Sequence, residues 1–106
     1  MGAFLENAQK ILDVARQADA GGLKPSDLAF VVEASGQIRI LADPGWSLAG
    51  LSAHYGASMS YRLRLDSNHL RVDGKSSGTV CQLSAERSGE FTRRWLSDRP
   101  TYLLTA

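Results

Sequence analysis

Residues 59–65 read MSYRLRL, and this stretch decides the fold class. Its odd positions carry apolar or aromatic side chains, whereas its even positions carry Ser60, Arg62 and Arg64. Side chains that alternate in this way point to opposite faces of a β-strand, one buried and one exposed to water. The stretch therefore predicts a half-buried strand in a sheet that has one apolar face.

The C-terminal half continues as a meander of short strands. Turn residues at Ser67-Asn68 end the first strand, and a flexible glycine-bounded loop is predicted at 74–78. The predicted strands that follow are 70–73, 79–84 and 102–105. Phe91 and Trp95 are spaced four residues apart, as on one face of a helix, so a short helix is predicted before the last strand.

The N-terminal segment is predicted to form an amphipathic helix that ends near residue 20. Its apolar residues recur at three- and four-residue steps, at Phe4, Ala8, Ile11, Leu12, Ala15 and Ala18. Gly21-Gly22 suits the C-terminus of this helix, and Pro25 prevents its continuation.

A hairpin is predicted next. Residues 28–34 are apolar and rich in β-formers, residues 37–41 alternate, and Gly36 lies in the turn between them. In the second of these strands Ile38 and Ile40 are expected to take the inner positions.

A second, short helix is predicted at about 45–55. Asp43 suits the N-cap of this helix. Pro44 suits the first helical position, where the backbone N–H of any other residue would lack a partner within the helix. Gly56 lies where a C-cap glycine is expected.

Helices and antiparallel strands in this order, without a repeated β-α-β alternation, indicate the α+β class. We expect a single antiparallel sheet of about five or six strands, with the N-terminal helix and one or two further short helices packed on one face. The whole chain, 1–106, is expected to be a single domain made of the helix at 1–20 and a sheet-rich body at 27–106.

Composition and charge argue against several classes of protein. The 106 residues include 12 Lys and Arg, 11 Asp and Glu, and one Cys, for a net charge of +1. Bulk positive charge is therefore no basis for nucleic-acid binding, and a lone cysteine forms neither an internal disulfide nor a cysteine zinc site. The chain start lacks a basic signal region and no stretch is apolar enough to span a membrane, so we expect a cytoplasmic protein of bacterial type.

The near-neutral total hides an uneven distribution. Residues 1–53 carry four basic and six acidic side chains, whereas residues 54–106 carry eight basic and five acidic ones. The surplus of positive charge therefore falls in the strands of the second half.

Four arginines of the predicted strands are candidate ligand-binding residues. Arg62 and Arg64 share the outward side of one strand, and a normal turn places Arg71 on the same side. Arg39 is outward on its own strand. Guanidinium groups on one surface bind phosphate or carboxylate bidentately. The alternative is a solvated face whose arginines pair with the carboxylates of Glu33, Asp66 and Asp73.

Trp46 and Trp95 are candidate stacking residues. Trp95 follows Arg93-Arg94, so its indole and the neighbouring guanidinium groups suit a base or a ligand ring, although a core anchor beside Phe91 is the simpler interpretation. Trp46 either packs the start of the second helix or stays exposed as a binding contact.

Three residues raise the question of catalysis: His54, His69 and Cys81. A thiol beside a histidine is a nucleophile, but Cys81 lies on the face predicted to be buried, where a free cysteine behaves as a small hydrophobe. The sequence contains no phosphate-loop, dinucleotide, zinc-protease or serine-hydrolase motif. We therefore predict no catalytic residue, no metal site and no cofactor.

These observations favour a non-enzymatic module that binds a protein partner or a second copy of itself as a homodimer, because the sheet must end in edge strands. The alternative is binding of a small anion or of nucleic acid on the arginine-bearing face. A cysteine-dependent enzyme is the third hypothesis, and no membrane partner is expected.

Overall fold

A seven-stranded antiparallel sheet and two helices make up the part of the chain that the computed structural model describes, which is residues 2–22, 27–87, 91–96 and 101–105, the last two ranges as backbone only. The elements in chain order are α1 (Gly2–Ala20), β1 (Leu28–Val32), β2 (Ile38–Ala42), α2 (Leu48–Tyr55), β3 (Met59–Leu65), β4 (His69–Ser76), β5 (Thr79–Glu86), β6 (Phe91–Leu96) and β7 (Thr101–Thr105). The expected α+β class is confirmed.

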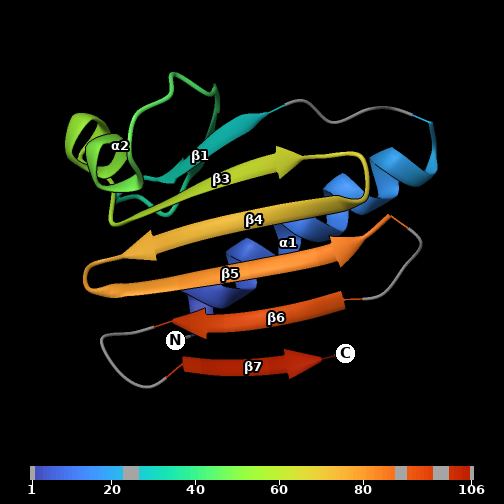
Figure 1. The fold of residues 1–106 in the computed structure, drawn as a ribbon. Helices are drawn as coiled ribbons and strands as arrows, with labels where there is room; N and C mark the ends of the chain where they lie inside the picture. Colours follow the sequence, from blue (N-terminus) through green and yellow to red (C-terminus); the bar gives the residue numbers. More distant parts are fainter. Residues whose placement is uncertain (1, 23–26, 88–90, 97–100, 106) are drawn as a thin grey trace.

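The strand order in the sheet is β2-β1-β3-β4-β5-β6-β7 (Figure 1). Strands β3 to β5 form the predicted meander, β6 and β7 extend it, and β1 lies between β2 and β3, antiparallel to both. The hairpin turn before β2 contains Gly36 at a φ of 87°, as its position predicts. The two edges of the sheet are therefore β2 and β7.

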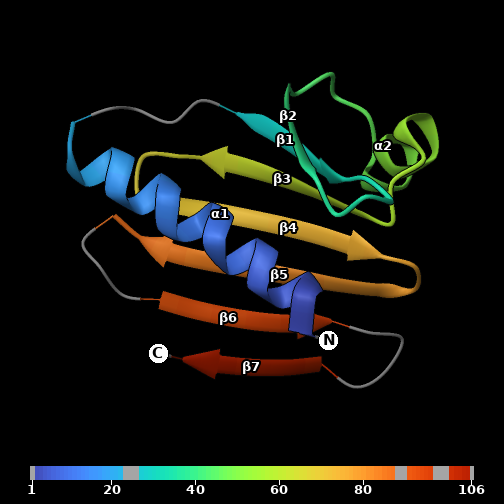
Figure 2. The same ribbon diagram turned by 180° about the vertical axis from the view of Figure 1, so that it is seen from behind.

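Helix α1 covers one face of the sheet and packs on β3, β4 and β5 (Figure 2). Its buried residues follow the predicted stripe and are Phe4, Ala8, Ile11, Leu12 and Ala15. They meet inward side chains of the strands, among them Tyr61, Leu63 and Val72. The Tyr61 hydroxyl donates a buried hydrogen bond of 2.7 Å to the Phe4 carbonyl, which ties the start of the helix to the centre of the sheet.

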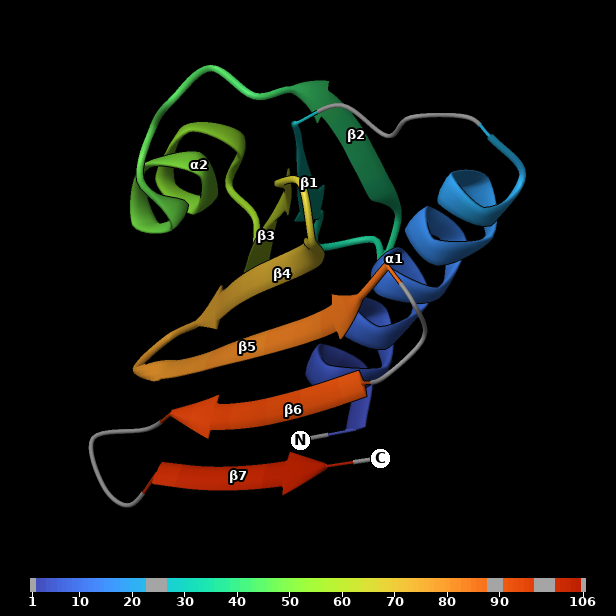
Figure 3. The same ribbon diagram turned by 45° about the vertical axis from the view of Figure 1, so that its right-hand side comes forward.

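Helix α2 packs on the opposite face, so the expectation that all helices share one face is wrong for this helix (Figure 3). Leu51 packs there against Ala29 and Val31 of β1, and the Ser60 hydroxyl donates a 2.7 Å hydrogen bond to the Leu48 carbonyl. The reason lies in β1, whose apolar residues point to both sides and require cover on both.

The second helix begins three residues later than predicted. Ser47, not Asp43, is its N-cap and accepts a 3.0 Å hydrogen bond from the Gly50 amide. Asp43 instead accepts a 2.9 Å hydrogen bond from the Gly45 amide within the preceding loop. The predicted C-cap at Gly56 is confirmed by its left-handed φ of 61°.

Residues 91–96 form strand β6, so the predicted third helix is wrong and the sheet has seven strands instead of five or six. A four-residue spacing of aromatic residues fits the period of a strand as well as that of a helix. Pairing with β5 and β7 on the two sides decides between them, and the register places Trp95 opposite Cys81. Neither described helix has the length and apolar character needed to cross a bilayer.

The predicted flexible loop at 74–78 is a two-residue turn, because β4 continues to Ser76 and β5 begins at Thr79. Gly74 is a buried strand residue. A Cβ atom at this position would lie 2.8 Å from the Tyr61 ring and 2.9 Å from the Cys81 sulfur. The glycine is needed for close packing of the tyrosine, which sequence alone did not distinguish from a loop glycine.

Replacing this glycine tests the packing. Gly74→Ala is expected to lower the free energy of unfolding by about 1–3 kcal/mol, because the added methyl group forces buried neighbours apart. Chemical denaturation measures the change. Gly78→Ala in the same hairpin is the control, since no atom lies within 4 Å of its added Cβ. Equal effects of the two substitutions would contradict the packing role of Gly74.

Candidate functional site

The structure places Arg62, Arg64 and Arg71 on one face of the sheet, where Arg64 lies directly opposite Arg71. This is the face on which α2 packs. Arg39 lies on the same face but on β2, and β1 separates it from the other three arginines. The four guanidinium groups therefore do not form one continuous row.

The side chain of Arg62 is largely buried and is bound by two partners. Its guanidinium lies 2.7 Å and 3.3 Å from the two carboxylate oxygens of Asp43 and also donates to the Trp46 carbonyl. The Arg62 and Asp43 side chains are 11% and 9% exposed. This bidentate pair joins β3 to the loop before α2, and it leaves Arg62 little capacity for a ligand.

Two of the other arginines also pair with carboxylates. Arg71 lies 3.1 Å from Asp73, and Arg39 lies 2.6 Å from Glu33 with its guanidinium over the Tyr55 ring. Arg64 is the one for which the described residues provide no carboxylate partner. The alternative interpretation, a solvated face whose arginines pair with Glu33, Asp66 and Asp73, accounts for Arg39 and Arg71 but not for Arg62, which pairs with Asp43.

Trp46 both packs on α2 and remains exposed. Its ring lies 4.6 Å from His54 in an edge-on contact and 6.4 Å from Tyr55, yet the residue is 41% exposed. The side chain of Trp95, like those of Arg93 and Arg94, lies outside the described residues, so its predicted stacking or core role stays a prediction.

Cys81 is buried in the core under α1. Burial, together with the charge of nearby Asp73, raises the pKa of its thiol to about 12, so the thiol stays protonated near neutral pH. His54 lies on α2 at the other face, and His69 is the first residue of β4, 3.7 Å from Asp66. Within the described residues, no group of three or more potential ligands gathers to hold a metal ion.

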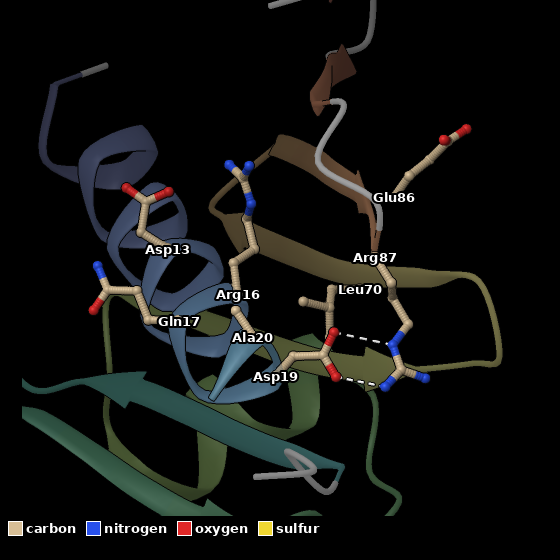
Figure 4. A pocket seen from close by; sticks show the side chains of 8 residues that line it. All are labelled: Asp13, Arg16, Gln17, Asp19, Ala20, Leu70, Glu86 and Arg87. Carbon is tan, nitrogen blue, oxygen red and sulfur yellow. Dashed lines mark hydrogen bonds and ion pairs between the residues drawn. The ribbon is translucent and has the colours of Figure 1, made fainter. Parts of the chain in front are cut away.

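A charged pocket of about 390 Å³ lies between the end of α1 and strands β4 and β5 (Figure 4). Asp19 and Arg87 form a bidentate pair across it, with distances of 3.0 Å and 2.5 Å. Its other charged residues are Asp13, Arg16 and Glu86. The lining carries three carboxylates and two guanidinium groups, so it offers no surplus of positive charge for an anion. The two paired residues are 68 positions apart, and no sequence pattern connects them.

An apolar groove of about 470 Å³ lies on the α1 face between the helix and β2. Its lining is apolar apart from Lys10 and includes Ile11, Val14, Phe30, Ile38, Ile40 and Leu63. Ile38 and Ile40 point to the predicted inner face, but they are 37% and 64% exposed, because α1 lies over β3 to β5 and leaves β2 uncovered. The predicted inward direction of these isoleucines is confirmed, but this face of β2 is not buried.

Strand β2 also presents an open backbone edge, since no other strand of the described residues pairs with its outer side. The Glu33 amide donates a 2.9 Å hydrogen bond to the Gln37 carbonyl directly opposite, so residues 37, 39 and 41 bond to β1. The amides and carbonyls of Ile38, Ile40 and Ala42 consequently point away from the sheet. The only charged residue of the strand, Arg39, is paired with Glu33. The sequence predicts that the sheet has edge strands, but it does not show that the apolar strand β2 is one of them.

The chain matches no protein-family model, and searches of curated proteins and of solved structures found no significant similarity. The candidate site is therefore assigned from its geometry as the open edge of β2 with the exposed side chains of Ile38 and Ile40.

Stability at low pH tests the Arg62–Asp43 pair. Hydrogen bonding to Arg62 holds the pKa of Asp43 below its usual value of 3.8, so the folded state binds this proton less readily than the unfolded state. The pair contributes stability above the usual pKa, and this contribution is lost as the pH falls through the lowered one.

Asp43→Asn is expected to lower the free energy of unfolding at neutral pH by about 2 kcal/mol, a typical value for hydrogen bonds to a charged group. The difference from the unmodified protein should shrink as the pH falls below about 4. Denaturant unfolding at a series of pH values measures it. Asp27→Asn, an exposed aspartate, serves as control, and a pH-independent difference for Asp43→Asn would contradict the pair's role.

Proposed function

We propose that this protein is a self-associating module in which two copies join through the open edge of β2. The observation that carries the proposal is that Ile38 and Ile40 have both outward backbone groups and exposed apolar side chains. A second strand at this edge satisfies those backbone groups and removes apolar surface from water in one step.

The lack of edge protection in β2 supports this proposal. Proteins that avoid edge pairing place proline, lysine or a bulge in their edge strands. Residues 38–42 contain neither proline nor lysine, and their register with β1 is unbroken. The charge of Arg39 is offset by Glu33, 2.6 Å away.

A second copy is the occupant that the geometry favours, since pairing of identical edges about a two-fold axis closes into a dimer. Pairing of β2 with the other edge, β7, would instead extend without closure. The strand has only five residues, so we expect an equilibrium that depends on concentration. The proposal places the protein in the cytoplasm, as its one cysteine is a free thiol.

Ile40→Lys tests the interface. Sedimentation equilibrium across the micromolar range is expected to show a monomer–dimer equilibrium for the unmodified protein. The lysine should weaken it by on the order of tenfold or more, because it places a charge on the pairing edge. Denaturation confirms that the variant folds.

Val14→Lys is the matched control, because Val14 is 65% exposed and lines the groove from α1, away from the strand edge. It should leave the dimer intact. A monomer at every concentration, or a dimer unaffected by Ile40→Lys, would refute the proposal. Loss of the dimer in Val14→Lys alone would place the contact on α1 instead.

Anion binding at Arg64 and Arg71 is a second candidate function, supported by one observation. Like charges directly opposite each other on neighbouring strands are unfavourable unless an anion lies between them, and Arg64 lies opposite Arg71. A small anion or a nucleic-acid phosphate fits such a pair. The internal ion pairs of the other arginines argue for weak binding.

Arg64→Ala tests this candidate. Binding of duplex DNA or heparin at low salt should weaken, and the slope of log K against log salt should fall by about one. Fluorescence anisotropy measures both. Lys10→Ala removes the same charge from the α1 side and should have little effect. No binding at low salt, or an equal loss in both variants, would exclude the site.

A further inference from the structure

The dimer interface of the proposed function has one favoured register. We infer that two β2 strands pair antiparallel with Ile40 of one copy directly opposite Ile40 of the second copy. This inference rests on the proposed function and adds to it the position of the two-fold axis.

The faces of the sheet restrict where the axis can lie. An axis perpendicular to the sheet keeps the α1 face of one copy beside the α1 face of the other. Residues opposite each other must then both be even-numbered or both odd-numbered, because successive side chains point to opposite faces. The axis therefore lies midway between two copies of the same residue. The central residues of the strand that can take this position are Arg39, Ile40 and Leu41.

Hydrogen bonding favours Ile40. The outward backbone groups belong to Ile38, Ile40 and Ala42. An axis at Ile40 pairs Ile40 with itself and Ile38 with Ala42 on either side, so every outward group of the strand is satisfied and all five residues overlap. An axis at Leu41 would place Ile38 opposite Pro44, which has no N–H to donate.

Side chains exclude the remaining choice. An axis at Arg39 would bring two guanidinium groups directly opposite each other, which is unfavourable. With the axis at Ile40, Arg39 lies opposite Leu41 of the second copy and keeps its ion pair with Glu33. On the α1 face, the two Ile40 side chains meet at the axis and Ile38 lies opposite Ala42. The sheet then continues from one copy into the other, with both apolar grooves on the same face.

Single cysteine variants test the register by disulfide capture. Opposite residues in a hydrogen-bonded antiparallel pair have Cα atoms about 5.5 Å apart, within the range of a disulfide. Two Ile40→Cys chains should therefore cross-link with oxidised glutathione, as seen on a non-reducing gel. In the same register two Arg39→Cys residues are offset by two positions and lie beyond the roughly 7 Å limit. The unmodified protein contains only Cys81, which is buried and protonated, and it therefore measures the background level of cross-linking.

A mixed experiment provides the second readout. The Ile38→Cys protein and the Ala42→Cys protein should cross-link only when the two are mixed, because Ile38 of one copy lies opposite Ala42 of the other. The expected rate for Ile40→Cys exceeds that for Arg39→Cys by on the order of tenfold or more. Sedimentation of the reduced variants shows whether each still forms the dimer.

The outcomes separate the register from the proposed function. A dimer in which Arg39→Cys cross-links faster than Ile40→Cys overturns the register but leaves pairing through β2. A monomeric unmodified protein, with no cross-link in any variant, overturns both. Growth into species larger than dimers indicates pairing of β2 with β7 and overturns the two-fold arrangement.

Discussion

Strand β1 is apolar at each of its five positions, from Leu28 to Val32, and it can be buried only if both faces of the sheet are covered at this point. Phe30 and Val32 join the core under α1, whereas Ala29 and Val31 pack beneath Leu51 of α2. Each helix thus has its own face. Strand β2 is left at the edge of the sheet, and α1 does not extend over its apolar face.

The position of α2 also determines how many arginines on its face of the sheet are free to bind a ligand. The loop that leads into this helix carries Asp43 to Arg62, and the helix itself brings Tyr55 under Arg39. Positive charge that looks available along the strands is therefore largely used to attach the loop and the helix to the sheet. The surface left without such contacts is apolar and lies on the other side, beside Ile38 and Ile40.

Local signals predicted much of the fold. The alternation at 59–65, the glycine turn at Gly36 and the C-cap at Gly56 each depend on nearby residues, and each prediction holds in the structure. Errors arose where a local pattern fits two structures. The local sequence of Gly74 fits a loop, but the residue lies in a strand with Tyr61 packed against it, and residues 91–96 form a strand because β5 and β7 pair with them.

The sequence by itself determined the class of fold and the inward and outward faces of its strands, because period and turn chemistry act over a few residues. It did not determine exposure. Ile38 and Ile40 face inward as their spacing requires, yet they stay open to water because α1 crosses other strands. The partners of Arg62 and Arg87 were likewise decided only by the tertiary structure, since long-range packing brings together residues that no local pattern connects.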